Sequence, residues 1–369
     1  MNQIQSTEKL FFELIRVAIS TQDTLTRAPS AQEWKQLYDM AKIQSLVGIC
    51  FAGVQRLQTQ RQESPKMLYF TWLGMAAKIQ QRNEVVNKQC RELSVKLNAD
   101  GFEHSIMKGQ QVGRYYGELA ALRQSGDIDV WVKGGMKKVV GYVQSISPTS
   151  SMSHKHVHLN VFEDTSVEMH YIPAELHCPW WNRRLNVYFD EHSQFKMVAD
   201  DEPLKGVFVP TDEFNVMHLV THAFRHLFGE GMTMRQLMDL YFVLMKWEAS
   251  AEAKVELCKE IEACGMLTFT RAMMYAMEKV LGMPKEKMIC EGNREDGELL
   301  INLIMDDSNA DAQEKRRRAG EKESAFGRFV RVQKLNMRLL KIASLEVFWT
   351  PLWRIWNWCW MRKNGYTYH

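Results

Sequence analysis

The sequence predicts an α+β fold in which a small mixed β-sheet lies between two helical regions of the chain. Apolar residues recur at helical spacing over residues 1–99 and again over residues 211–369. Between these regions, residues 100–172 alternate short apolar strands with helical patterns and end in a hairpin. We therefore expect an N-terminal helical region at 1–99, an α/β core at 100–210 and a C-terminal helical domain at 211–369.

Length and composition limit the class of protein. The 369 residues are 46% apolar and 25% charged, so the chain is globular and long enough for two or three domains. A net charge of +3 is too small to indicate a nucleic-acid binder. The seven cysteines form no CxxC pair, and the polar N-terminus has no signal-peptide order. With no stretch of about 18 uncharged apolar residues, we expect a cytoplasmic protein with reduced thiols.

The first 99 residues are predicted to be helical. Apolar residues from Leu10 to Ala18 recur at helical spacing, and Ser30-Ala31-Gln32-Glu33 has the form of a capping box before a second amphipathic run. A long helix is predicted from 66 to 98. We interpret the apolar stripes of this region as core.

The hydrophobic period changes at His104. In chain order we predict a strand at 105–107, a helix containing Val112 and Tyr116, a strand that starts at Asp127, a helix at 136–145, and an antiparallel hairpin of residues 154–162 and 166–172. Residues 173–210 are predicted to be mostly irregular, with a short strand at 206–209. This order produces the small mixed sheet.

From Thr211 the chain is predicted to be helical again. Three histidines lie four residues apart near one helix face, where we favour core hydrogen bonding over metal binding: His218, His222 and His226. Arg235 and Asp239 have the spacing of an ion pair within a helix. A charge run over residues 313–323 is interpreted as a solvated helix end or linker.

The C-terminal end combines basic and aromatic residues. Basic side chains form a stripe on a predicted helix, at Arg328, Arg331, Lys334, Arg338 and Lys341. Apolar side chains lie on other turns, at Phe329, Val332, Leu339 and Ile342. Five tryptophans follow between residues 349 and 360. The tail either lies in a membrane interface or packs its aromatic residues on protein, and we favour packing.

The stretch from Arg123 to Val132 carries two carboxylates at the start of an apolar strand. Because strand side chains alternate, Asp127 and Asp129 point the same way, about 6.6 Å apart. The strand is predicted to be buried on both sides, with a start that faces water. Neighbouring carboxylates repel unless a positive group lies between them, and a hard cation such as Mg²⁺ is the usual one. The alternative is that each Asp caps a turn or faces water.

Three alternating histidines lie on one face of a predicted strand, at His154, His156 and His158. Alternating histidines can indicate zinc. No cysteine or carboxylate with a matching spacing accompanies them, so the sequence disfavours a zinc site there.

Four motifs in a fixed order resemble a known family. They are Lys108-Gly109, the run from Arg123 to Asp129, Glu168-Met169-His170, and the pair His222 and His226 followed by Arg235 and Asp239. Over about residues 95–245 the chain is similar to the nucleotidyltransferase superfamily with the DNA polymerase β-type core, and within it to a bacterial branch of uncharacterised nucleotidyltransferases. The glycine spacing departs from the superfamily pattern. Members of the superfamily usually have a Gly-Gly or Gly-Ser some ten residues before the Asp pair, whereas here 17 residues separate Gly109 from Asp127.

The resemblance implies an enzyme that moves an NMP group from an NTP, such as ATP, to a hydroxyl or phosphate acceptor. Two Mg²⁺ ions would be held by Asp127, Asp129 and Glu168, and Glu168 is also a candidate base. Candidate triphosphate-binding groups are Lys108, Gly109, Arg123, Ser125 and Gly126. His170 is a candidate contact to nucleotide or acceptor, and equally a structural histidine.

The acceptor implied is a small molecule, a sugar, a protein side chain or an RNA end, while the modest net charge disfavours long nucleic acid. Two other functions stay open. One is a non-catalytic nucleotide-binding or antitoxin-like partner protein. The other is a peripheral membrane protein of envelope or glycan assembly, anchored by the Trp-rich tail. The intact Asp127, Asp129 and Glu168 favour the enzyme.

Overall fold

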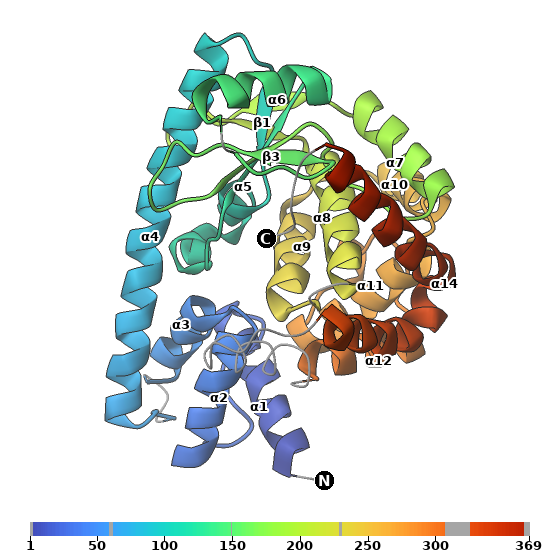
Figure 1. Ribbon diagram of the computed structural model, residues 1–369. Helices are drawn as coiled ribbons and strands as arrows, with labels where there is room; N and C mark the ends of the chain where they lie inside the picture. The colour runs from blue at the N-terminus through green and yellow to red at the C-terminus, as the bar shows by residue number, and fades with distance from the viewer. Residues whose placement is uncertain (1–2, 59–61, 149, 229–230, 307–324, 365–369) are drawn as a thin grey trace.

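The computed structural model of the protein describes residues 3–58, 62–148, 150–228, 231–306 and 325–364. The fold is α+β, as the sequence predicts, with helices on both sides of a small mixed sheet (Figure 1). Some residues singled out above lie outside the described part: the charge run at 313–323 and the side chains of Arg328, Phe329, Arg331 and Val332.

The sheet has four strands in the order β1-β2-β4-β3. Their bounds are β1 His104–Met107, β2 Ile128–Val132, β3 His156–His158 and β4 Val167–His170. Strand β1 is antiparallel to β2, β2 is parallel to β4, and β3 is antiparallel to β4. The register pairs Asp129 with both Met107 and Glu168, so the beginnings of β2 and β4 lie side by side.

Helices cover both faces of the sheet, and every residue of β2 is buried, as predicted. The even-numbered residues of β2 pack against α4 (Lys66–Ala99) and α6 (Gly135–Ile146) in one core. On the other face, Trp131 stacks on Phe214 of α8 (Asp212–Leu227). Figure 1 shows α6 and α8 on opposite sides of the sheet. The odd-numbered residues of β2 therefore face α8.

The N-terminal region contains α1 Gln3–Ala18, α2 Ala31–Ile43, α3 Val47–Gln58 and the long α4. The predicted capping box is present at the start of α2. The Ser30 side chain accepts a hydrogen bond from the Glu33 N–H, and the Glu33 carboxylate accepts one from the Ser30 N–H. These two bonds satisfy backbone donors that a helix start leaves free.

The C-terminal region is helical, as predicted. Its elements after α8 are α9 Met234–Lys246, α10 Ala251–Ala263, α11 Leu267–Leu281, η2 Lys285–Lys287, α12 Arg294–Met305 and α14 Ala325–Lys363. Apolar side chains of this region and of α1, α2 and α3 share one hydrophobic core, which also includes Met107 and Trp131 of the sheet, whereas the other face of the sheet and α6 belong to a second core. The domain boundaries near residues 99 and 210 stay a prediction.

Residues 173–210 are more regular than predicted. They contain α7 Pro179–Glu191 and an antiparallel pair of short strands, β5 Phe195–Met197 and β6 Phe208–Pro210. Proline suits the first turn of a helix, and the buried residues of α7 recur at helical spacing, at Leu185, Tyr188 and Phe189. This periodicity was present in the sequence, so the prediction of a mostly irregular segment was wrong.

The helix predicted after Lys108-Gly109 is broken into two pieces. The α-helix α5 spans Gly109–Gly113, and a 3-10 helix, η1, spans Arg114–Leu122. Gly117 interrupts η1 with a φ of 57°, which glycine adopts readily because it has no Cβ.

The Trp-rich tail lies on α14, which is docked by buried polar contacts. The fully buried Glu346 carboxylate accepts hydrogen bonds from the backbone N–H groups of His177 and Cys178 and from Arg225. Trp353 stacks on His177, with ring centroids 4.0 Å apart. Trp353 therefore packs on protein, whereas other apolar residues of α14 are exposed, so the choice between packing and a membrane interface stays a prediction. In the described part of the chain, no helix has the length and apolar content needed to cross a bilayer.

Candidate active site

Two carboxylates and an imidazole meet where β2 and β4 run side by side. Asp129 lies opposite Glu168 in the parallel pairing, and His170 follows Glu168 by two residues on the same face. The His170 Nε2 lies 2.9 Å from Asp129 Oδ1 and 3.2 Å from Glu168 Oε2. Ligand atoms of the three side chains all lie within 4.8 Å of one another. The backbone register therefore assembles this group.

Lys108 delivers a positive charge to the group. It follows β1 directly and has a φ of 46°, an unusual value for a residue with a Cβ. Its Nζ lies 2.7 Å from Asp129 Oδ1. A backbone conformation of this kind costs of the order of 1–3 kcal/mol and persists only where the surroundings enforce it. The turn that starts at Lys108 therefore fixes the ammonium on Asp129.

The pKa values reflect these contacts. Burial opposes ionisation of Lys108 and Asp129, but their mutual attraction outweighs it, so the pKa of Lys108 is raised and that of Asp129 is lowered. Burial also opposes ionisation of Glu168, yet the hydrogen bond to His170 and the neighbouring His156 lower its pKa to about 2. The site thus holds ionised carboxylates that attract cations.

Asp127 lies at the exposed rim of the site, just before β2. The surrounding protein and then the charge of Asp129 raise its pKa. Among the described residues, the converging group of ligand atoms contains Asp129, Glu168 and His170 and does not include Asp127. The structure therefore brings two of the three predicted carboxylates together and places the third at the entrance.

Hydrogen bonds from α4 hold the loop before Asp127 in place. The Asn83 side-chain amide donates to the carbonyl oxygens of Ala121 and Arg123, at 2.7 and 2.8 Å. Ser125 Oγ, a predicted phosphate contact, is buried and has no hydrogen-bond partner within the described residues. An unsatisfied buried hydroxyl costs free energy, so a ligand oxygen there would be stabilising.

The two predicted glycines differ in their surroundings. Gly126 is exposed, and an added Cβ would meet no atom within 4 Å. Gly109 starts α5 with a φ of 42°, and an added Cβ would lie 3.6 Å from the carbonyl oxygen of Asp127. A side chain is therefore disfavoured at Gly109 by its backbone conformation and not by lack of space.

Arg123, predicted as a phosphate cation, is buried in an ion pair. Its Nε and Nη2 both lie 2.7 Å from the carboxylate of Asp239, which also accepts a hydrogen bond from Tyr116 at 2.6 Å. The partner predicted for Asp239 was Arg235, and that prediction was wrong. The bidentate contact from η1 to α9 satisfies Asp239 more completely than a neighbour on its own helix.

Arg235 is the functional candidate that the sequence interpretation missed. Its Nη1 donates to the carbonyl oxygen of Gln124 at 3.3 Å, and its buried Nε has no partner among the described residues. Burial and then the charge of Arg123 lower its pKa, while Asp239, Tyr116 and Asp127, in that order, raise it. A guanidinium stays charged in proteins, so a half-buried one next to the Gln124 carbonyl, with a donor that has no partner among the described residues, suits an anionic ligand.

The histidine row of α8 faces the site. Burial and then the charge of Lys108 lower the pKa of His218 to about 3 and that of His226 to about 4. The Nε2 of His218 contacts the carbonyl oxygen of Pro173 at 3.0 Å, as expected for a core histidine. His222 and His226 are half-buried and in ring contact, with centroids 4.4 Å apart. Neutral imidazoles therefore line the α8 side.

The donor set fits a divalent cation. Carboxylate oxygens are the preferred ligands of Mg²⁺, and Asp129 and Glu168 supply them from adjacent strands. The Lys108 ammonium on Asp129 shows that this position already attracts positive charge.

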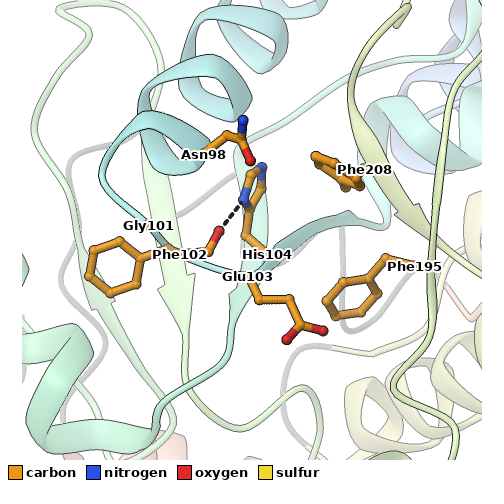
Figure 2. A pocket seen from close by; sticks show the side chains of 7 residues that line it. All are labelled: Asn98, Gly101, Phe102, Glu103, His104, Phe195 and Phe208. Atoms are coloured by element: carbon orange, nitrogen blue, oxygen red, sulfur yellow. Dashed lines mark hydrogen bonds between the residues drawn. The ribbon is translucent and has the colours of Figure 1, made fainter.

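A separate cavity lies at the other end of β1 (Figure 2). It measures about 380 Å³ and is lined by Phe102, Phe195 and Phe208 together with His104 and Glu103. His104 pairs with Val132 at the far end of β2, away from the partner of Asp129. The cavity is therefore not part of the carboxylate site.

A family model described as "Uncharacterised nucleotidyltransferase" matches residues 30–282. No curated protein matches the chain. Among solved structures, the chain is similar to an antigenic nucleotidyltransferase-like protein from Paracoccidioides brasiliensis, with 12% identity and a TM-score of 0.33. The match covers 56% of this chain and 94% of that one.

Proposed function

The chain belongs to the family of uncharacterised nucleotidyltransferases, as its motifs predicted, and we propose that it transfers an NMP group from an NTP to a hydroxyl or phosphate acceptor. One observation supports this most strongly. The parallel pairing of β2 and β4 sets Asp129 beside Glu168, with Lys108 and Asp127 next to them. The acceptor is a small molecule, a sugar or a protein side chain in this proposal.

Asp127, Asp129 and Glu168 would hold two Mg²⁺ ions, which neutralise charge on the attacking and leaving oxygens. His170 orients the Asp129 and Glu168 carboxylates through its Nε2. The contacts with His170 and His156 lower the pKa of Glu168, so the ionised carboxylate would be available to bind a metal ion, and it would also remain a candidate base.

The triphosphate would be bound by groups around the entrance loop. Arg235 and Ser125 each offer a buried donor that has no partner in the described part of the chain, and the Lys108 ammonium, which is paired with Asp129, would lie between this carboxylate and the phosphates. Arg123 has a positioning role in this proposal, because its guanidinium is already paired with Asp239.

The test is calorimetric titration of each NTP with Mg²⁺ into wild-type protein and the double variant Asp127→Ala/Asp129→Ala. We expect wild-type binding that collapses in the double variant. The matched control is Asp200→Ala/Asp201→Ala, which removes two exposed aspartates of a surface turn and should bind as wild type does. A folded wild type that binds no NTP would contradict the proposal.

Binding and catalysis are separated by a second measurement. Pyrophosphate release is followed with the preferred NTP and candidate acceptors from each class. Release that depends on Asp129 supports the transferase. Binding without release for any acceptor would favour the non-catalytic nucleotide-binding protein instead.

A further inference from the structure

Two histidines of β3 and Glu168 of β4 form a second group of metal-ligand atoms. Ligand atoms of His156, His158 and Glu168 all lie within 4.8 Å of one another. In the antiparallel pairing, His158 lies directly opposite Glu168, and His156 lies opposite His170. Directly opposed residues and residues two apart share one face of a sheet. The strand register therefore brings the three side chains together.

The contact between His156 and Glu168 is close to the separation expected of two ligands of one ion. The Nδ1 of His156 lies 3.1 Å from Glu168 Oε2. This nitrogen is buried and has no hydrogen-bond partner in the described residues, because the contact lacks the alignment of a hydrogen bond. Two ligands bound tetrahedrally at about 2.0–2.2 Å to one ion lie roughly 3.3–3.6 Å apart, slightly farther than this contact. A metal ion between them would satisfy the free nitrogen.

We infer that His156, His158 and Glu168 form a binding site for a transition-metal dication, with Zn²⁺ as the preferred ion. Two imidazoles and one carboxylate suit Zn²⁺ or Mn²⁺, whereas Mg²⁺ prefers oxygen ligands alone. Three protein ligands leave coordination positions open to water or to a substrate group.

The sequence disfavoured zinc here because no carboxylate had a matching spacing near the histidines. The fold supplies that carboxylate from the neighbouring strand, opposite His158. The third histidine of the pattern, His154, belongs elsewhere, because its ring contacts Glu175 and Asn357. The site thus uses two of the three alternating histidines.

Glu168 belongs to both groups of ligand atoms, so a Zn²⁺ ion on β3 would lie next to the carboxylates of the candidate active site. The inference needs only the donor atoms of these three residues. It therefore stands or fails independently of the proposed transfer reaction.

The test is calorimetric titration of metal-free full-length protein with Zn²⁺, and separately with Mg²⁺, supported by the visible absorption spectrum of the Co²⁺-loaded protein. We expect wild type to bind Zn²⁺ more tightly than Mg²⁺. His158→Ala should weaken Zn²⁺ binding at least about tenfold, since loss of even an outer-shell partner of a metal site costs that much. His156→Ala is the second variant.

The matched control is His192→Ala, which removes a half-exposed histidine that directly follows α7, contacts the Tyr188 carbonyl oxygen and lies 3.9 Å from Glu213. It should bind Zn²⁺ as wild type does. Equal Zn²⁺ affinity in wild type, His158→Ala and His156→Ala would overturn the inference. NTP binding with Mg²⁺ is measured on wild type in parallel, so loss of one finding is distinguished from loss of the other.

Discussion

Arg123, directly after η1, and Asp239 of α9 form a buried bidentate ion pair. Removal of one partner leaves the other charge buried without compensation, which costs about 3–5 kcal/mol. We therefore expect Arg123→Met to lower the free energy of unfolding by about that amount in urea denaturation. Arg294→Met removes one partner of the exposed pair with Glu298 and should leave stability unchanged. Equal effects of the two variants would contradict the structural role of Arg123.

Arg235 lies one helix turn before Asp239, yet we expect its replacement to affect ligand binding more than stability. A charge-assisted hydrogen bond contributes about 1.5–3 kcal/mol, and each 1.4 kcal/mol changes Kd tenfold. Arg235→Gln should therefore weaken Mg²⁺–NTP binding at least about tenfold in calorimetry. Arg183→Gln, at an exposed position of α7, is the control. A thermal unfolding shift without any change in Kd would reassign Arg235 to structure.

The partner of Asp239 is Arg123 and not Arg235, and this pairing could not be predicted from the sequence. The i, i+4 spacing of Arg235 and Asp239 permits an ion pair but does not exclude a better partner. Arg123 lies 116 positions away in the chain, and the hydroxyl of Tyr116 completes its contact with Asp239. Only the packing of η1 against α9 reveals this. The group of Asp129, Glu168 and His170 was foreseeable, because strand alternation and motif order place these residues on one face.

At the scale of elements, Glu175 links the segment after β4 to the loop before β3 and, through His154, to Asn357 of α14. Burial opposes its ionisation, but the hydrogen bond to His154 lowers its pKa from 4.5 to about 2. Because the folded-state pKa is depressed, the ionised carboxylate stabilises the fold above pH 4.5. This contribution is lost as the pH falls from 4.5 toward 2.

Glu175→Gln should therefore reduce stability at pH 7 and flatten the acid side of the stability profile. The measurement is the free energy of unfolding as a function of pH between 7 and the acid limit of folding. Glu163→Gln, in an exposed turn, provides the comparison and should keep the wild-type profile. Parallel acid-side slopes for Glu175→Gln and wild type would show that His154 does not hold this carboxylate.

The helices were predictable where apolar residues recur at helical spacing over many residues. The helix from residue 66 and the capping box at Ser30 follow from repeated local signals, and the mixed sheet follows from strand order. The helix α7 was missed although Leu185, Tyr188 and Phe189 mark its buried face. The strand predicted at 206–209 overlaps β6, whereas β5 was missed because three residues are too few for periodicity to distinguish a strand from a loop.

At the scale of the whole molecule, the helices before and after the sheet are parts of one packed unit. Arg16 of α1 donates to the carbonyl oxygen of Val280 in α11 at 2.9 Å, and the Thr21 hydroxyl donates to that of Leu281 at 2.9 Å. Residues of α1 and α11 also belong to the same hydrophobic core. The N-terminal helices therefore pack directly against the C-terminal helices, a contact that local sequence patterns do not encode.

Gln44, between α2 and α3, is a buried polar residue that joins the N-terminal helices to the C-terminal helices. Its amide donates to the carbonyl oxygen of Ile304 in α12 at 3.0 Å, and its oxygen accepts from the N–H of Met234 in α9 at 2.8 Å. Leucine at this position would leave both backbone groups buried without partners. Each such group costs about 1–3 kcal/mol. We expect Gln44→Leu to lower the free energy of unfolding by at least about 2 kcal/mol.

Hydrogen exchange followed by mass spectrometry distinguishes a shared unit from two independent ones. If the N-terminal and C-terminal helices unfold together, Gln44→Leu will accelerate exchange in α1, α9 and α12 alike. Gln81→Leu, at an exposed position of α4, should leave all three helices protected. Faster exchange confined to α1 and its neighbours would mean that residues 1–99 open on their own. The predicted boundary near residue 99 would then separate two units of stability despite the shared core.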